Sequence, residues 1–572
     1  MTSAAQSASA GARRRFDISR LILAVFAVFL VLLIGLPMAW LVYFSLTDAG
    51  GALSLANFHQ VATSPQFVTP FLTTLTLAIS VGLIACVVAA PLGWLVARTD
   101  MPLRREVRAL VMASFVTPPF LGAIAWEILA APNSGILNHI WRAVTGAESD
   151  EHLLDIYSLP GLIFVIACYT FPYVFVLVTN ALERIPAELE DASAMLGARI
   201  WNTVRRITIP LVLPAVLAGG LIAFLQAMTL FGSPAILAMP AGFHTMTTRI
   251  WSLFQFPPKP GVAAAAALPL LIITIILLRT QGWILGRRGY AVVGGKYGQP
   301  RLVRLGAWRW LALGIALVVL CLPVFLPYAA LIKAAFTRLP SDPLLLETLT
   351  LKHVRFVFLE FSQTRTALVN TLVLGTASAT IGTVLALVIA YLTTRQAIAG
   401  HRILGFLATA PIAIPGIVLG VGLFLSYTRP PLILYGTLWI LLLAYLTIEL
   451  PAAYQQLQSA FRAVHPELEE ASRILGATRL RALRDVTAPL LRTGVIAAWC
   501  FIFIGVMREL SAAIMLFTAN TRVISVVIYD LNESGDLGAI SVLGLTMLIV
   551  TFAVVLIVNR LPGTGSPRMA GG

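Results

Sequence analysis

The chain contains one motif twice: residues 188–210 read ELEDASAMLGARIWNTVRRITIP, and residues 467–489 read ELEEASRILGATRLRALRDVTAP. The two copies align without a gap at a constant offset of 279 residues. Both are polar segments in a chain that is otherwise strongly apolar. A duplication at matched places predicts that the chain consists of two related halves.

Each copy predicts a short helix followed by a sharp turn. Pro186 and Pro466 stand near a helix start, and the carboxylates that follow within one turn complement the positive end of the helix dipole. Gly197 and Gly476 permit the left-handed turn that ends a helix. Arginines come next, namely Arg199, Arg205 and Arg206 in the first copy and Arg479, Arg481 and Arg484 in the second. We call residues 183–210 the first polar loop and residues 462–489 the second polar loop.

The composition is that of a membrane protein. Of the 572 residues, 59% are hydrophobic and only 11% are charged, whereas soluble domains carry about 25% charged residues. The apolar runs that can each supply a span of about 20 residues number twelve, six in each half. They are 21–47, part of 49–97, 109–126, 156–182, part of 207–248, 260–278, 310–332, 366–394, 403–428, 430–448, a segment around 493–518, and 537–559. We therefore predict an all-α polytopic membrane protein of two tandem six-helix halves, with proline kinks in its third and ninth spans.

The distribution of charge predicts the orientation of the chain. With the N-terminus inside, 29 of the 40 Lys and Arg residues fall on the cytoplasmic side, as the positive-inside rule requires. The net charge of +15 therefore needs no nucleic acid partner. Both polar loops and both termini are expected in the cytoplasm. Arg98 and Arg395, which end spans two and eight, are expected to be anchors at the membrane interface.

No cofactor is expected. The four cysteines are isolated within apolar spans and suggest neither disulfides nor a metal cluster. The glycine-rich connector from Arg279 to Arg309 lacks the spacing of a phosphate-binding loop, because Tyr297 follows Lys296 where a hydroxyl for Mg²⁺ is needed. The connector is therefore expected to be a linker between the two halves and not a nucleotide-binding loop. The first apolar segment is too long for a signal-peptide core, so we predict a retained span.

Ionisable residues in apolar segments are candidates for a translocation path. Glu127 lies near the outer end of span three, and Arg508 and Glu509 interrupt span eleven. Burying such a group alone costs about 2.5–3.5 kcal/mol on insertion scales. Each candidate has a structural alternative, since Glu127 can reach outer water and Arg508 can neutralise Glu509 between helices. Glu449 is expected near the inner end of span ten, where it can extend to the cytoplasm.

The duplicated motif resembles the EAA loop of ABC importer permeases, whose pattern is Glu-Ala-Ala, three residues, Gly, nine residues, Ile-x-Leu-Pro. Both copies keep this spacing. The departures are Asp191 for the first Glu, Ser193 and Ser472 for the second Ala, and Ile209 and Ala488 for the Leu. The resemblance implies that each loop is a coupling helix that docks into a groove on an ATP-hydrolysing subunit. The coupling residues it implies are Glu190, Asp191, Ala192, Ser193, Gly197, Glu469, Glu470, Ala471, Ser472 and Gly476.

The resemblance also implies partners and a substrate. Two copies of a cytoplasmic ABC ATPase would each grip one loop, and a periplasmic binding protein would deliver the solute to this permease in the bacterial inner membrane. The fused halves, the Pro-Asn-Ser-Gly of residues 132–135 and Arg508-Glu509-Leu510 resemble the ferric-iron importers most, which implies Fe(III) as the solute. That family usually has Lys at the position of Arg508 and Pro at that of Ser511. Related permeases carry organophosphonates, polyamines, thiamine or sulfate.

Two other classes of function remain as alternatives. An ion-gradient-driven secondary transporter of twelve spans needs no ATPase, but it gives no reason for duplicated cytoplasmic loops. A lipid-modifying enzyme would need a nucleophile and base or a metal-ligand cluster, and the sequence shows neither.

The expected division of the chain follows from these assignments. It comprises a disordered basic tail held at the anionic membrane surface (1–17), a first permease half (18–282) containing the first polar loop, a cytoplasmic linker (283–307), a second permease half (308–560) containing the second polar loop, and a C-terminal tail (561–572).

Overall fold

The computed structural model describes residues 18–48, 50–148, 150–287, 302–342, 347–398 and 400–560. The two expected tails, and most of the expected linker, lie outside these ranges. The described chain is all-α, apart from three isolated β-bridges. Ten of its helices are long and apolar enough to cross a membrane, or twelve when each of two bent pairs counts as one span. The predicted fold class is therefore confirmed.

The first half comprises α1 (Ile18–Leu30), η1 (Val31–Gly35), α2 (Leu36–Ser45), α3 (Ala56–Thr63), α4 (Pro65–Arg98), α5 (Arg104–Val116), α6 (Pro119–Ala130), α7 (Ile136–Thr145), α8 (Leu159–Glu183), α9 (Ala187–Met195), α10 (Ile200–Thr203), η2 (Val204–Thr208), α11 (Ile209–Thr229), α12 (Gly232–Leu237), α13 (Met246–Ser252) and α14 (Pro260–Arg287).

The second half comprises α15 (Trp308–Leu320), η3 (Cys321–Phe325), α16 (Leu326–Phe336), α17 (Lys352–Arg355), η4 (Phe356–Glu360), α18 (Ser362–Thr394), α19 (His401–Thr409), η5 (Ala410–Ala413), α20 (Gly416–Tyr427), α21 (Leu438–Ala463), α22 (Pro466–Ile474), α23 (Arg479–Ala482), η6 (Leu483–Thr487), α24 (Ala488–Arg508), α25 (Ala513–Leu516), α26 (Ile524–Glu533) and α27 (Leu537–Asn559).

The third and ninth spans are broken at their prolines. The axes of α5 and α6 differ by 98°, and those of the segments 401–413 and 416–427 differ by 108°. Thr117 and Pro118 have extended backbone between α5 and α6, as does Pro415 before α20. A residue that precedes proline is pushed out of the helical region, and proline itself donates no N–H. The prolines therefore reorient the chain more sharply than a kink.

Each half packs its central helices in the same way. The long helix α4 lies against α8 and α11 in the first half, and α18 lies against α21 and α24 in the second. At one end of these bundles, the hydroxyl of Thr74 accepts a hydrogen bond from the backbone N–H of Met246 at 2.8 Å, and the hydroxyl of Thr371 accepts one from Ile524 at 2.9 Å. The two halves thus repeat at the level of single contacts.

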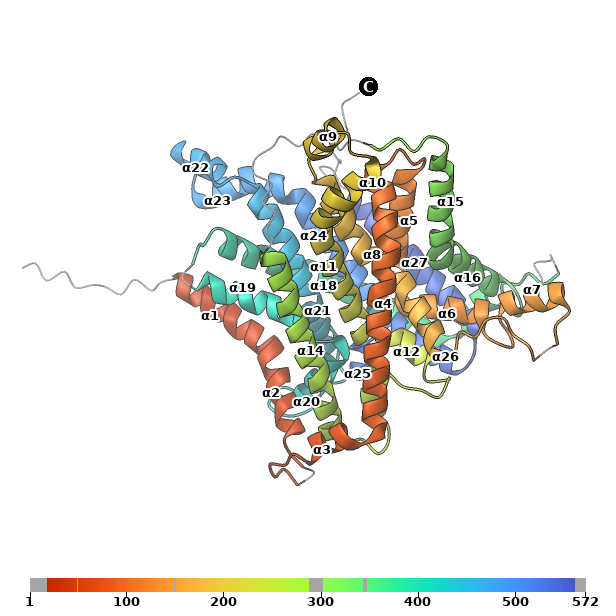
Figure 1. Ribbon diagram of the computed structural model, residues 1–572. Coiled ribbons are helices and arrows are strands. Elements are labelled where there is room, and N and C mark those ends of the chain that lie inside the picture. Colours follow the sequence, from red (N-terminus) through yellow and green to blue (C-terminus); the bar gives the residue numbers. More distant parts are fainter. Residues whose placement is uncertain are drawn as a thin grey trace, which may run out of the picture.

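The first span of each half packs against the opposite half. Helix α2 lies on α20, where the hydroxyl of Tyr427 donates to the carbonyl of Leu32 at 3.3 Å. Helix α16 lies on α6, and the hydroxyls of Tyr328 and Thr117 are 2.7 Å apart at the start of that contact. In Figure 1, the red α1 and α2 accordingly run beside the cyan α19 and α20.

Some helix boundaries differ from those expected. Helix α21 runs to Ala463, well beyond the predicted limit at residue 448, so Glu449 lies in its middle and not at its inner end. Helix α24 ends at Arg508, whereas the predicted eleventh span continued to about residue 518. Helix α14 extends to Arg287, five residues beyond the predicted end of the first half at 282. The extension of α21 reflects tertiary packing, since Leu450, Tyr454 and Phe461 beyond the expected limit are buried, and local hydropathy does not report such packing.

Candidate functional site

Both polar loops form the predicted helix and turn. Helix α9 ends two residues before Gly197, whose φ is +76°, and α22 ends two residues before Gly476, whose φ is +93°. The N–H of Ala198 donates to the carbonyl of Ser193, and that of Ala477 donates to Ser472, both at 3.1 Å. The N–H of each glycine donates to the carbonyl three residues earlier, which is the second hydrogen bond of the same motif. This is the Schellman arrangement, which satisfies the last carbonyls of a helix and needs a left-handed residue.

Two large apolar side chains stand exposed at the tip of each loop. Met195 and Leu196 are 83% and 88% exposed, and Ile474 and Leu475 at the equivalent positions are 85% and 89% exposed. Isolated exposed apolar residues are common, but a matched pair on both copies indicates an interaction surface. Sequence analysis missed this pair. The signal available was the repetition of two apolar residues directly before each glycine.

The polar residues of the motif divide by the direction they face. Ala192, Ala471 and Glu470 are exposed, whereas Glu469 is largely buried. The hydroxyl of Ser193 lies 2.8 Å from that of Thr203 and so ties α9 to α10. Asp191 and Ser472 are partly buried. The side chain of Glu190 lies outside the described part of the structure.

Arg98 and Arg395 fasten the polar loops to the long helices. Arg98, at the end of α4, is fully buried and donates to the carbonyls of Leu182 and Ile185, each at 3.4 Å. Arg395, at the end of α18, donates to the carbonyl of Val464 at 3.0 Å. Val464 and Ile185 are equivalent under the 279-residue offset. The expectation that these arginines are interfacial anchors is therefore wrong, because both point into the protein.

The candidate path residues Arg508 and Glu509 lie where α24 ends. Glu509 has extended backbone, and its carboxylate accepts hydrogen bonds from the N–H groups of Ala512 and Ala513 at 3.0–3.2 Å. The guanidinium of Arg508 lies over the ring of Phe115, a residue of the first half, at 4.9 Å. Glu509 is thus a cap for the turn into α25, and Arg508 bridges the two halves.

Glu449 joins this charged group. A Cβ atom placed on Gly505 would lie 2.2 Å from the Glu449 carboxylate, so the absence of a side chain at Gly505 makes room for it. Gly505 lies on α24 only one helical turn before Arg508 and Glu509, so Glu449 approaches α24 beside both of them. The structure therefore brings three ionisable residues of the second half together where sequence analysis proposed two. We call Glu449, Arg508 and Glu509 the charged cluster.

Glu127 has a different partner. Its carboxylate accepts a hydrogen bond at 2.8 Å from the hydroxyl of Tyr157, which precedes α8. Burial, and then the Glu127 carboxylate, raise the pKa of Tyr157 well above its ordinary value, so this hydroxyl remains a donor at physiological pH. Glu127 is therefore held by the protein and does not simply extend into outer water.

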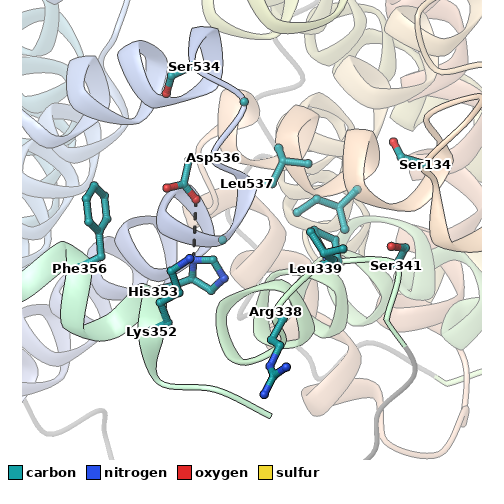
Figure 2. A pocket seen from close by; sticks show the side chains of 14 residues that line it. Ser134, Arg338, Leu339, Ser341, Lys352, His353, Phe356, Ser534, Asp536 and Leu537 are labelled. Carbon is teal, nitrogen blue, oxygen red and sulfur yellow. Dashed lines mark ion pairs between the residues drawn. The ribbon is translucent and has the colours of Figure 1, made fainter. Parts of the chain in front are cut away.

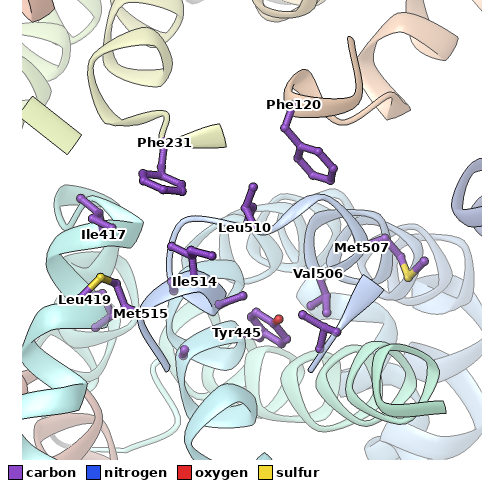
Figure 3. Close-up of a cluster of buried hydrophobic side chains, with 14 of the residues drawn as sticks. Phe120, Phe231, Ile417, Leu419, Tyr445, Val506, Met507, Leu510, Ile514 and Met515 are labelled. Atoms are coloured by element: carbon purple, nitrogen blue, oxygen red, sulfur yellow. The ribbon is translucent and has the colours of Figure 1, made fainter. Parts of the chain in front are cut away.

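Apolar side chains surround the meeting point of the halves. Figure 3 shows Phe120 and Phe231 of the first half facing Leu510 of the second half, with Met507 and Ile514 nearby. A Cβ atom on Gly232 would lie 2.7 Å from that of Phe120 and 3.2 Å from Leu510. The two halves therefore meet in an apolar constriction next to the charged cluster, too tight to admit a side chain at Gly232 without a shift of its neighbours.

A basic cavity of about 670 Å³ opens at the end of the bundle away from the polar loops. Figure 2 shows Arg338, Lys352 and His353 around it, with Asp536 facing His353. The imidazole of His353 lies 3.1 Å from the carbonyl of Thr337 through Nε2 and 3.8 Å from the Asp536 carboxylate through Nδ1. Positive side chains thus outnumber negative ones in this cavity. Among the described residues, in this cavity or outside it, no group of three His, Cys, Asp or Glu side chains is placed to hold a metal ion.

Comparison with known proteins agrees with this geometry. The ferric transport system permease protein FbpB of Actinobacillus pleuropneumoniae is 26% identical over 453 residues, which cover 78% of this chain and 64% of that protein. The putative ferric transport system permease protein FbpB 1 of Haemophilus influenzae is 27% identical over 413 residues, covering 71% and 64%. The sulfate transport system permease protein CysT of Escherichia coli is 25% identical over 247 residues, covering 42% and 85%. The chain thus spans 64% of the length of both ferric permeases.

A family profile gives the assignment. The profile described as the binding-protein-dependent transport system inner membrane component matches residues 89–289 and 382–570, more than half of the chain. Each matched segment contains one polar loop. The interpretation as a permease subunit, and not an enzyme, is therefore confirmed, and the ion-gradient and lipid-enzyme alternatives are disfavoured. The chain belongs to the family of inner membrane components of binding-protein-dependent transport systems, the permeases of ABC importers.

Proposed function

We propose that this chain forms the translocation path for ferric iron, delivered by a periplasmic binding protein and driven by two copies of a separate ABC ATPase. The observation that carries the proposal is the matched pair of loops, each a Schellman-capped helix with two exposed apolar residues at its tip. Two identical sockets on a pair of ATPase subunits would accept two such tips.

The proposed orientation places both loops and both termini in the cytoplasm. In Figure 1, α9 and α22 lie in the upper part of the molecule and α3, between spans one and two, lies at the bottom. Closure of the ATPase subunits would bring the loops together. Arg98 and Arg395 would carry that displacement into α4 and α18, whose ends they fasten to the loops.

The basic cavity is the proposed contact for the binding protein on the outer side. Its excess of positive charge favours an acidic projection from that partner. In the first half, the uncharged Asn57 occupies the place of His353 and donates to the carbonyl of Thr47 at 2.9 Å. A partner with two unlike lobes would therefore dock in one orientation only.

Ferric iron is the proposed substrate because two relatives are named as ferric permeases and two of the three residues of the charged cluster carry carboxylates. A hard cation prefers oxygen ligands, and Glu449 and Glu509 supply them in the charged cluster. With only two carboxylates there, the cation would pass without a fixed site. Glu127 would act earlier, near the outer end of the path.

Sulfate is a second candidate, on a specific observation. The Nε of Arg508 is buried and has no hydrogen-bond partner among the described residues. A guanidinium in that condition suits an oxyanion, and the Escherichia coli sulfate permease is among the relatives. Organophosphonates would use the same contact.

Uptake by cells tests both candidates. Cells lacking this chain, and the same cells complemented with it, are supplied with labelled Fe(III) or labelled sulfate, with cellular ATP maintained or depleted. Complementation should restore ATP-dependent Fe(III) uptake and leave sulfate uptake unchanged. Restored sulfate uptake alone would reject iron in favour of the second candidate. Uptake that persists without ATP but stops with an ionophore would reject the ATPase partner as well.

A further inference from the structure

Glu469 joins three elements of the second half through one carboxylate oxygen. Its Oε1 accepts hydrogen bonds from Arg395 Nε at 3.1 Å and from Arg395 Nη2 at 3.0 Å. The same oxygen accepts the hydroxyl of Thr487 at 2.9 Å. Glu469 belongs to α22, Arg395 ends α18, and Thr487 directly precedes α24. Arg395 also holds the carbonyl of Val464, so the start of α22 is fastened at two points.

The setting of this contact differs from that of the other charges on the loop. The side chains of Arg395 and Glu469 are only 11% and 14% exposed. The next residue, Glu470, is exposed. Adjacent carboxylates on one helix therefore face in different directions, one into the permease and one toward solvent. A contact made by so buried a pair cannot also be offered to a cytoplasmic partner.

Helix α18 is fastened at its other end too. Asn370 donates to the carbonyls of Asn520 and Arg522 at 3.2 and 3.0 Å, and Thr371 accepts from the N–H of Ile524. Helix α18 has 33 residues, a length of about 50 Å at the usual rise per residue. One uninterrupted helix thus connects the second polar loop with the segment before α26 on the opposite side of the bundle.

We propose that Arg395, Glu469 and Thr487 form a latch that makes α22 move as one body with α18 and α24. This inference rests on the proposed function, in which an ATPase displaces α22. With the latch closed, the displacement reaches α18 and α24 directly. With it open, the turns on either side of α22 absorb the motion. Glu469 is then a positioning residue within the permease, and Glu470 remains the residue that meets the ATPase.

The first half has the same attachment in another form. Arg98 replaces Arg395, is fully buried, and donates to the carbonyl equivalent to that of Val464. Thr208 and Glu190 stand at the positions equivalent to Thr487 and Glu469. Because the side chain of Glu190 lies outside the described residues, the hydrogen bonds of the latch are known only in the second half. The test therefore uses the second half.

The test uses the full chain with charge-exchanged variants. Arg395→Glu and Glu469→Arg each break the pair, and the double variant Arg395→Glu/Glu469→Arg restores it with reversed charge. Thr487→Val removes the hydroxyl at nearly constant volume. The matched control is the exposed pair Arg355 and Glu360, which are 3.0 Å apart at the far end of α18. Its single and double exchanges introduce the same charges outside the polar loops.

Two measurements decide the proposal. Amide hydrogen exchange of residues 466–474 in the chain alone, reconstituted in lipid, should rise at least about fivefold in each single charge variant, the effect of about 1 kcal/mol of coupling. It should fall back in the double variant and stay unchanged in the control. In the complex with the ATPase, each single variant should lower solute transported per ATP hydrolysed, and the double variant should recover most of it.

The outcomes separate the latch from the proposed function. Unchanged exchange in both single variants, or a double variant no better than the singles, would overturn the latch. Altered exchange with a normal ratio of transport to hydrolysis would overturn its role in transmission. If the wild-type chain bound no ATPase, the proposed function would fail, and the exchange experiment would still decide whether the contact exists. Glu470→Gln should weaken ATPase binding without changing exchange.

Discussion

Replacement of the two loop glycines should show how much of coupling depends on the shape of one turn. Gly476 has φ +93° and Gly197 has φ +76°, and no atom lies within 4 Å of a Cβ built on either one. The Cβ of a replacement at either position therefore meets no neighbour among the described residues. The whole intrinsic cost is the left-handed backbone, about 1–2 kcal/mol for an ordinary residue.

The magnitude and rank of the effects follow from this geometry. A cost of 1–2 kcal/mol lowers the ratio of formed to unformed turn by about 5- to 30-fold. Asn tolerates positive φ best and a β-branched residue worst. We therefore expect Gly476→Asn to be mild, Gly476→Ala intermediate and Gly476→Val severe. Gly197 lies nearer the usual left-handed φ of about +57°, so each replacement there should be milder.

The assay is solute transported per ATP hydrolysed in proteoliposomes containing the permease and its ATPase. Amide exchange of residues 467–477 in the permease alone gives the population of the turn. The two readouts should change in the same order. If Gly476→Val matched Gly476→Asn in both, backbone strain would not be what these glycines relieve. If only the transport ratio changed, and in order of side-chain size, a clash with the ATPase would explain it instead.

Three further predictions concern other parts of the molecule. Glu509→Gln keeps an acceptor for the N–H groups that follow it and should impair transport with little loss of stability, whereas Glu509→Ala should lose about 1 kcal/mol; equal losses of thermal stability would contradict the capping role. Gly505→Ala should cost about 1–3 kcal/mol by crowding Glu449, and additional Glu449→Asp should recover part of it; additive losses in denaturant titrations would show that the two sites do not touch. Burial, followed by the charge of Arg249, lowers the pKa of His244. The unfolded chain therefore binds a proton more readily, and the free energy of unfolding should fall as pH drops through about 6.5. Thermal unfolding of His244→Asn should lack this dependence on pH, and an unchanged dependence would show that His244 is not its source.

The motif itself made the loops predictable. The glycine after each helix and the spacing of residues within each polar loop are local features, so residue types and their spacing were enough to predict them. The breaks beside Pro118 and Pro415 were also visible, although their angle was not. A proline fixes where the helix stops, but the direction of the next segment depends on the helices that receive it.

Features decided by long-range contacts were not predictable. Arg98 looked like an interfacial anchor because an arginine at the end of an apolar span usually is one, and only the position of the loop carbonyls shows otherwise. Glu449 looked peripheral because local hydropathy ended the span too early. The exposure of Met195 and Leu196 was also missed, since a single apolar residue is assumed to be buried and only the repetition of the pair before both glycines indicated otherwise.

The exchange of first spans has a consequence for how the protein is made. A chain emerges from the ribosome N-terminus first, so α2 enters the membrane long before α20 exists to pack against it. Helix α6 likewise waits for α16. Neither half can complete its packing until the other has been synthesised. The first half therefore completes its packing only when the second half assembles. If translation stalled between the halves, the faces of α2 and α6 that await the second half would remain exposed to lipid and to membrane proteases.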